Sequence, residues 1–236
     1  MAVVIRRPGI THEEYVNYIK HIHGYKITCS NPLAIKKYVQ NYVYDGVFCS
    51  NYDNKNWTYQ ICYHADSVTE LYFENKEEMA KTFSSDYIKN FVGPDGINFS
   101  DMKKSITALV QEKEWEIKNP SEGGFKVFYF LKKSDAMNKE DFAKAWKDSH
   151  KKIMDNNEIL SKKIRKFINN IPIEGSETDY FGGDKITYDG IASIWVDSVN
   201  DFRVYQAELE KAVKNNWEFF NPSKSFVIFG DYLVFI

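Results

Sequence analysis

The 236-residue sequence lacks the features that define several common protein classes. Its three cysteines are odd in number and form no CxxC pair, so they support neither a disulfide framework nor a zinc ribbon. Prolines are few, at six, and 16% of the residues are aromatic, which excludes a disordered chain. No apolar run approaches the roughly 18 residues of a membrane-spanning helix, and the first seven residues are too short for a signal peptide. We therefore expect a globular, cytoplasmic protein that does not act at a membrane.

Neither sign of charge is in excess, because 31 Lys and Arg residues stand against 33 Asp and Glu residues. Nucleic-acid-binding proteins usually carry a basic patch, so we expect no nucleic-acid partner. The P-loop, GxGxxG and GxSxG motifs are absent, which argues against nucleotide-dependent chemistry and serine hydrolysis. The sequence also has no HExxH motif, and His21 and His23 would lie about 200° apart on a helix. We therefore expect no metal site.

The chain contains one pattern of segments twice. Residues 13–23 align with residues 140–150 at an offset of 127, and residues 66–73 align with residues 189–196 at an offset of 123. The expected elements in each copy follow the order β-α-β-β-α-β, which is typical of a ferredoxin-like domain. The predicted fold class is therefore α+β, with two ferredoxin-like repeats.

Turn-forming residues mark the boundary between the copies. Residues 118–124 are rich in Asn, Pro, Ser and Gly, so we interpret them as a linker between repeats at 1–119 and 124–236. We also expect polar loops at residues 45–56 and 175–184, between the second and third strands of each copy. Thr11 to Glu14 form a capping-box pattern, which predicts the start of the first helix.

Each copy places a histidine at the end of the apolar face of its first helix. With 3.6 residues per turn, Tyr15, Ile19 and His23 share one face. Their counterparts in the second copy are Phe142, Trp146 and His150. A histidine at the edge of an apolar pocket suits general acid–base catalysis near neutral pH. The alternative is a partly buried histidine that bonds a backbone carbonyl and secures the helix end.

The sequence resembles the EthD family in several ordered segments. These are the strand-to-helix turn Arg6–Thr11, the helix spacing Tyr15-x3-Ile19-x3-His23 with Phe142-x3-Trp146-x3-His150 in the second copy, the second-strand segment Lys37–Asn41 and the third-strand segment Asp66–Asn75. The first copy departs from the family pattern with Ile19 in place of the usual aromatic residue. The second copy has Ser193 where the first has Glu70, so the two sites need not be equivalent.

The resemblance implies a dimeric α+β barrel, in which two ferredoxin-like units pair their sheets and carry their helices outside. Here one chain would supply both units, either as a monomeric pseudo-dimer or as a homodimer of such chains. Ligand pockets in this superfamily usually lie between the sheet and the helices of each unit. Relatives include cofactor-free monooxygenases, polyketide cyclases, dehydratases, decarboxylases and haem-binding enzymes, and fold alone does not choose among them.

Acidic and aromatic residues supplement the two histidines as candidates for the site. Asp66 and Asp189 could orient a histidine or bind substrate, or they could cap a turn. Glu70 would be an acid–base partner of His23 if it points inward, and a solvated residue if it points outward. The catalytic candidates are therefore His23, His150, Glu70 and Asp66. The candidates for substrate contact, which could equally be core residues in the case of the aromatics, are Tyr18, Tyr38, Tyr72, Trp146, Trp195 and Asp189.

Together these features predict an enzyme of small-molecule metabolism. We expect cofactor-independent dehydration, decarboxylation or cyclisation of a hydrophobic, aromatic or polyketide-like substrate in an apolar pocket. One alternative is a cofactor-free monooxygenase, or a non-covalent haem enzyme with His23 or His150 as the axial ligand. A further alternative is a non-catalytic ligand-binding module.

Overall fold

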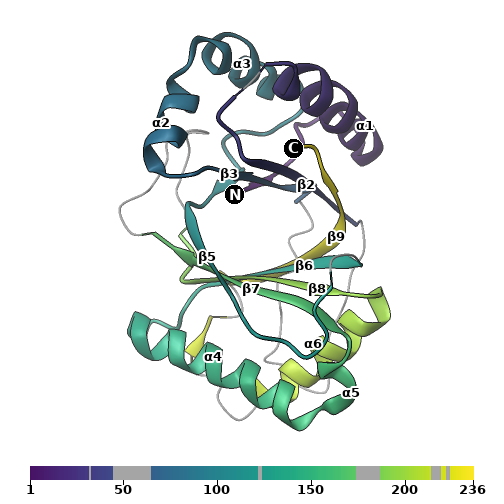
Figure 1. Cartoon of the computed structure of the whole chain (residues 1–236), viewed down its shortest axis with the longest axis vertical. Coiled ribbons are helices and arrows are strands. Elements are labelled where there is room, and N and C mark those ends of the chain that lie inside the picture. Colours follow the sequence, from purple (N-terminus) through teal and green to yellow (C-terminus); the bar gives the residue numbers. More distant parts are fainter. Residues whose placement is uncertain (32, 45–64, 122–123, 174–186, 214–218, 222–223) are drawn as a thin grey trace.

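The computed structural model describes the chain except residues 32, 45–64, 122–123, 174–186, 214–218 and 222–223. The two expected polar loops at 45–56 and 175–184 therefore lie outside the described residues. Figure 1 shows a strongly curled sheet at the centre of the molecule, with the helices of the first half on one side and those of the second half on the other.

A sheet of nine strands is built from both halves. The first half supplies β1 (Ala2–Val4), β2 (Lys37–Val43), β3 (Ser67–Tyr72), β4 (Ile106–Thr107) and β5 (Val110–Glu114). The second half supplies β6 (Phe125–Leu131), β7 (Ile164–Pro172), β8 (Gly190–Val196) and β9 (Phe226–Val234). The spatial order is β4-β1-β3-β2-β9-β6-β8-β7-β5. In the first half β4 lies beside β1 and β3 beside β2, and in the second half β9 lies beside β6 and β8 beside β7. This is the ferredoxin-like arrangement, and β5 lies outside it, at the end of the sheet.

Two seams join the halves into one barrel. At the first seam β2 pairs with β9, and at the second β5 pairs with β7, both antiparallel. Gly230 lies opposite Val43 at the first seam, where a Cβ atom would sit 1.8 Å from the carbonyl oxygen of Tyr42. Glycine is therefore required for the strands to approach this closely. The chain forms the intramolecular dimeric α+β barrel that the repeats predict.

Helices cover the outer faces of the sheet. In the first half they are α1 (His12–Tyr18), the π-helical segment η1 (Ile19–Ile27), η2 (Thr28–Ser30), α2 (Lys76–Ser84), η3 (Ile88–Val92), α3 (Gly93–Asp95) and η4 (Gly96–Asn98). In the second half they are α4 (Lys139–Asn156), α5 (Glu158–Ser161) and α6 (Val199–Val213). The predicted capping box is present, because the Thr11 hydroxyl accepts from the Glu14 amide and the Glu14 carboxylate accepts from the Thr11 amide. None of the helices in the described parts of the chain is long and apolar enough to span a membrane.

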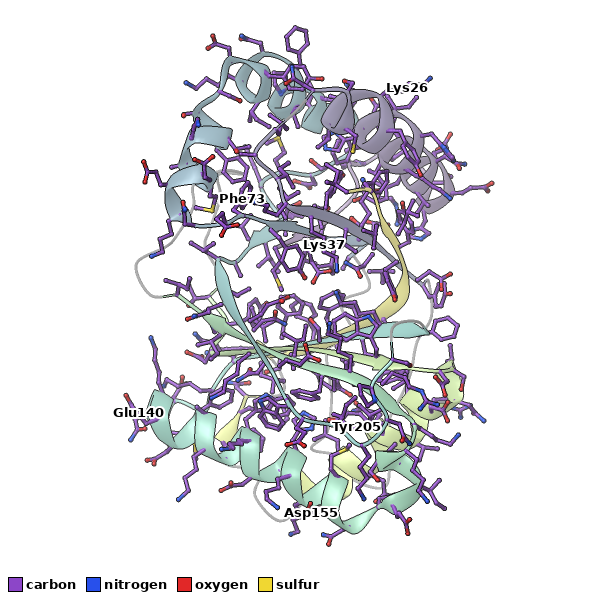
Figure 2. The ribbon with its side chains drawn as sticks, viewed as in Figure 1. Lys26, Lys37, Phe73, Glu140, Asp155 and Tyr205 are labelled. Carbon is purple, nitrogen blue, oxygen red and sulfur yellow. The ribbon has the colours of Figure 1, made fainter. Side chains whose placement is uncertain are left out.

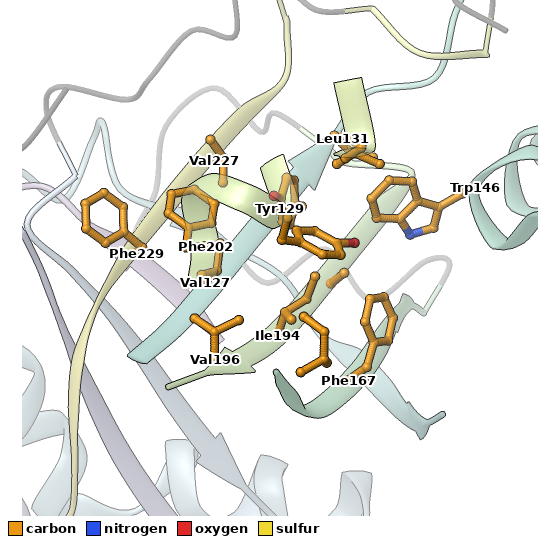
Figure 3. Packing of buried hydrophobic residues seen from close by; sticks show 14 of the residues in the cluster. Val127, Tyr129, Leu131, Trp146, Phe167, Ile194, Val196, Phe202, Val227 and Phe229 are labelled. Atoms are coloured by element: carbon orange, nitrogen blue, oxygen red, sulfur yellow. The ribbon is translucent and has the colours of Figure 1, made fainter. Parts of the chain in front are cut away.

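Strand alternation divides the buried side chains into three groups. A large aromatic cluster fills the space between the sheet and the helices of the second half (Figure 3). In Figure 2, Tyr205 lies in this layer, whereas Phe73 lies beside α2 in the first half. A second cluster, which includes Phe128, Phe130 and Ile228, occupies the interior of the barrel. The third cluster, between the sheet and helices of the first half, contains five buried residues among those described: Ala2, Val4, Tyr15, Ile19 and Phe99. The first half is therefore the less densely filled.

Candidate functional site

An apolar cavity of about 480 Å³ lies between the sheet and the helices of the first half. Alternate residues of β1, β2 and β3 form its floor, including Val4, Tyr38 and Leu71, and the helical segments supply its walls. Most lining side chains are aliphatic or aromatic. Among the described lining residues, His23 is the one histidine. A mostly apolar cavity with few polar groups is the usual form of a small-molecule site.

The corresponding space in the second half is filled. Phe142, Trp146, Phe167, Tyr205 and Phe219 are all buried there and pack together between α4, α6 and the sheet. Trp146, a predicted substrate contact, is therefore part of this core. The two halves share a topology, but these described aromatic side chains occupy in the second half the position that the cavity has in the first.

His23 is held at the cavity by a carboxylate that the sequence analysis did not identify. Its Nδ1 lies 2.8 Å from Oδ2 of Asp95, and its ring packs on Phe99 with centroids 4.6 Å apart. The residue lies in the π-helical segment η1, a backbone form that occurs often at functional sites. The structure describes no partner for Nε2.

Three donors converge on Asp95. The Tyr18 hydroxyl donates to Oδ1 over 2.6 Å, Asn98 Nδ2 donates to the same atom over 2.9 Å, and His23 binds the other oxygen. Burial raises the pKa of Asp95, but the hydrogen bonds from His23, Tyr18 and Asn98 outweigh it, so the pKa is lowered. Because an ionised carboxylate only accepts, Nδ1 of His23 carries a proton and a neutral ring presents its lone pair at Nε2. This is the arrangement of a general base with an orienting acid.

Tyr18 supports this pair rather than lining the cavity. Burial and its hydrogen bond to Asp95 raise the pKa of Tyr18 to about 12, so the hydroxyl stays protonated and donates. In the sequence, glycine and proline flank Asp95, a pattern that is typical of a turn. No spacing in the sequence links residue 95 to residue 23, so the pair is visible only in the fold.

His150, the second histidine candidate, lies in the aromatic core of the second half. It is 1% exposed, and its ring packs against Trp146 and Phe167 with centroids 4.6 and 4.1 Å away. Its Nδ1 lies 2.6 Å from the hydroxyl of Tyr205, so its partner is a side chain instead of a backbone carbonyl. Burial lowers the pKa of His150 to about 3, which keeps the ring neutral. His150 lines neither of the two cavities described here.

Glu70 does not accompany His23, because it lies on the opposite face of the sheet. Its neighbours Thr69 and Leu71 line the cavity, so strand alternation turns Glu70 into the barrel. There it forms a buried ion pair with the ammonium of Lys126 and accepts a hydrogen bond of 2.9 Å from Asn41. Burial raises the pKa of Glu70, but Lys126 and Asn41 outweigh it and the pKa is lowered. The structure thus contradicts the predicted pairing of Glu70 with His23.

Trp195 also faces the barrel interior. The ammonium of Lys126 lies 4.3 Å from the centroid of its ring, a cation–π contact between paired residues of the neighbouring strands β6 and β8. Tyr72 lies on the same face of β3 as Glu70 and lines a second cavity. Of the aromatic candidates, Tyr38 lines the cavity that contains His23, where the Gln40 amide donates to its hydroxyl.

Asp66 and Asp189 both hold backbone turns. Asp66 is buried and accepts from the Arg6 amide over 2.8 Å, from the Arg6 guanidinium and from Nδ1 of His12. Asp189 accepts from the Lys133 amide over 3.0 Å and pairs with the Lys132 ammonium. Neither carboxylate lines a described cavity. The geometry of Asp189 matches the capping alternative, whereas Asp66 both holds the turn at Arg6 and orients His12, a histidine that lines neither cavity.

The described residues contain no group of three or more His, Cys, Asp and Glu side chains that could hold a metal ion. A haem would need an axial ligand and partners for its two propionates. His23 could be an axial ligand, but the described lining of its cavity contains no Lys or Arg. The described residues of the cavity therefore do not fit haem.

Comparison with known proteins gives one family match, in the first half of the chain. Residues 7–103, which include both His23 and Asp95, match the family model of the EthD domain. No curated protein matches the chain significantly. One similar solved structure is an anthrone oxidase-like protein, with a TM-score of 0.60 and 10% identity, covering 99% of this chain and 90% of that chain. Another, from Fusobacterium nucleatum, is provisionally described as a monooxygenase, with a TM-score of 0.54, 8% identity and coverage of 98% and 90%. At these identities the two structures show a shared fold.

Proposed function

Because residues 7–103 match the family model of the EthD domain, we propose that the protein is a small-molecule enzyme with its site in the first half. The observation that carries the proposal is the His23–Asp95 pair at an apolar cavity of about 480 Å³. The cavity suits an aromatic or polyketide-like ligand. Asp95 lies outside the cavity lining and acts on the ligand through His23.

In the proposed reaction His23 removes a proton from an acidic carbon or hydroxyl group of the ligand. Nε2 accepts the proton, and the carboxylate of Asp95 stabilises the resulting imidazolium through Nδ1. The apolar walls exclude water, which strengthens this charge interaction. The same imidazolium can return the proton to a leaving hydroxyl, which completes a dehydration, or to another carbon, which completes an isomerisation or cyclisation. A well-placed acid–base group contributes on the order of 10²–10⁴ in rate.

A second candidate function is cofactor-free oxygenation. Two proteins with this fold are described as an anthrone oxidase-like protein and, provisionally, a monooxygenase. The first step would be the same proton removal by His23. The electron-rich carbanion would then react with dioxygen, so that a CH₂ group becomes a carbonyl and the second oxygen atom leaves as water.

Anthrone is a suitable test substrate, since it is aromatic and has an acidic CH₂ group. Enolisation measured under anaerobic conditions reports proton transfer, and oxygen uptake in air reports oxygenation. We expect His23→Ala to lower the rate at least 100-fold and Asp95→Asn to lower it at least 10-fold. His21→Ala is the matched control, because His21 is exposed on the same helical segment.

Equal rates for His23→Ala, His21→Ala and the unaltered protein would exclude His23 as the base. Turnover that requires air and consumes one dioxygen per product would select the oxygenation candidate. Saturable binding of anthrone without any turnover would favour the non-catalytic ligand-binding alternative.

A further inference from the structure

A second cavity, of about 490 Å³, adjoins the one that contains His23. Five residues line both cavities: Met1, Leu71, Phe73, Met79 and Leu109. The second cavity extends from this shared wall to the edge of the barrel at β3 and β5. The two spaces are therefore neighbours that are separated by side chains.

The shared wall consists of apolar side chains, and two of them are methionines. Met79 comes from α2 and Leu71 from β3, so opposite sides of the wall belong to different elements. Methionine is unbranched and adopts alternative rotamers at low cost. A ligand longer than the first cavity can therefore extend along this wall into the second.

The second cavity offers hydrogen-bond acceptors where the first offers apolar surface. The Tyr72 hydroxyl donates to Oε1 of Glu112 over 2.8 Å and lies 3.3 Å from Oε1 of Glu70. Burial and these two carboxylates raise the pKa of Tyr72, so its hydroxyl remains a donor. Glu70 is already compensated by Lys126. Glu112 is exposed on β5 and, among the described residues, accepts only from Tyr72, so it retains accepting capacity.

The remaining charged groups at this cavity do not take up the accepting capacity of Glu112. Glu74 pairs with the exposed Lys36 ammonium over 3.3 Å. The Met1 ammonium donates to the Ala108 carbonyl over 2.7 Å and attracts the carboxylates of Glu70 and Glu112 without a hydrogen bond to either among the described contacts. Lys76 begins α2 at the outer edge. The carboxylate of Glu112 is thus the acceptor that a ligand could use.

We propose that the second cavity binds the hydrogen-bond-donating end, a hydroxyl or an ammonium, of an elongated ligand whose apolar body occupies the first cavity. This inference rests on the proposed function and specifies the substrate class: an amphipathic molecule with an aromatic body and a polar end. Glu112 and the Tyr72 hydroxyl beside it form the recognition pair.

The test compares four naphthalene probes by isothermal titration calorimetry with the full chain. The probes are butylnaphthalene, 4-naphthylbutan-1-ol, 4-naphthylbutylamine and 4-naphthylbutanoate. We expect the alcohol or the amine to bind about tenfold more tightly than butylnaphthalene, because hydrogen bonds to a charged group are the stronger ones. We expect the carboxylate probe to bind more weakly than butylnaphthalene. Comparison of the alcohol with the amine shows whether the cavity prefers a hydroxyl or an ammonium donor.

Glu112→Gln should remove most of the gain in affinity that the hydroxyl or ammonium end provides, and it should leave the affinity for butylnaphthalene unchanged. Glu114→Gln is the matched control, since Glu114 is exposed on the same strand and face but lines neither cavity. Both sites are exposed, so both variants should keep the melting temperature of the unaltered protein.

Binding of butylnaphthalene without any gain from the donor-bearing end would overturn this inference and leave the proposed function intact. The same is true if the gain survives equally in Glu112→Gln and Glu114→Gln. Failure of all four probes to bind would overturn the apolar site of the proposed function together with the inference that rests on it.

Discussion

The buried ion pair between Glu70 and Lys126 leads to a sharp prediction about stability. Both side chains are about 2% exposed, and the pair crosses the barrel interior from β3 to β6, from one half to the other. Glu70 also accepts from Asn41, and Lys126 lies over the ring of Trp195. Each charge therefore depends on the other for most of its compensation.

Removal of either partner leaves an uncompensated charge in a dry environment, which typically costs about 3–5 kcal/mol. For a chain of this size, 1 kcal/mol corresponds to a melting-temperature change of about 2–4 °C. We therefore expect Glu70→Gln and Lys126→Met to lower the melting temperature by about 6–20 °C each. The double variant should cost less than either single variant, because it removes both charges.

Urea unfolding of the four proteins measures these differences. Lys151→Met is the surface control: Lys151 pairs with Asp155 on α4, both side chains are more than half exposed, and the loss should stay below about 1 kcal/mol. Single variants that cost less than about 1 kcal/mol, or a double variant that costs the sum of both, would refute the reasoning. Because Glu70 lies on the face opposite His23, the folded fraction of each variant should keep its enolisation rate.

Three further predictions follow from the geometry. The pKa of His150 is about 3 in the folded chain and about 6.5 when unfolded, so the unfolded state binds the extra proton and stability falls as the pH drops below 6.5. Between pH 7 and pH 5 the free energy of unfolding, measured with urea, should therefore fall by about 2 kcal/mol less in His150→Phe than in the unaltered protein. Equal decreases in the two proteins would contradict this prediction. Gly230→Ala should lower the melting temperature far more than Gly96→Ala. A Cβ atom at residue 230 would lie 1.8 Å from the Tyr42 carbonyl oxygen, whereas the nearest described contact of a Cβ atom at residue 96 is 3.4 Å. Similar melting temperatures would show that the seam can adjust. Titration with hemin should give no saturable Soret band, because the described lining of the cavity offers no cation for the propionates; a band that saturates at one equivalent and disappears in His23→Ala would establish haem binding.

The fold was predictable because its signals are local and repeated. The offsets of 127 and 123 residues placed equivalent strands and helices in both halves, and the capping box placed the start of α1. The face of each strand was harder to assign. Both faces of this sheet are covered, one by helices and the other by the opposite side of the barrel. Apolar residues therefore occur at both the odd and the even positions of a strand. That is why the direction of Glu70 could not be read from the sequence.

The site was predictable only in part, for a related reason. The position of His23 at the end of an apolar helix face is a local property and is visible in the sequence. Its partner Asp95 comes from a glycine- and proline-flanked segment that tertiary contacts fold into the short helix α3. His150 occupies the equivalent position on α4, but the rings of Trp115, Phe167 and Tyr205, contributed by distant segments, pack against it and close the space around it. No pattern within either helix distinguishes an open cavity from a filled one.

Fusion of the two units into one chain has a consequence for how substitutions act. In a barrel made of two identical chains, every change in sequence is made twice, so a residue that filled one helix–sheet space would fill both. Here the two spaces are encoded separately: Phe142 and Trp146 occupy one, while Tyr15 and Ile19 border an open cavity in the other. One half can therefore hold a binding site while the other supplies rigidity, and the two properties can be varied independently within a single molecule.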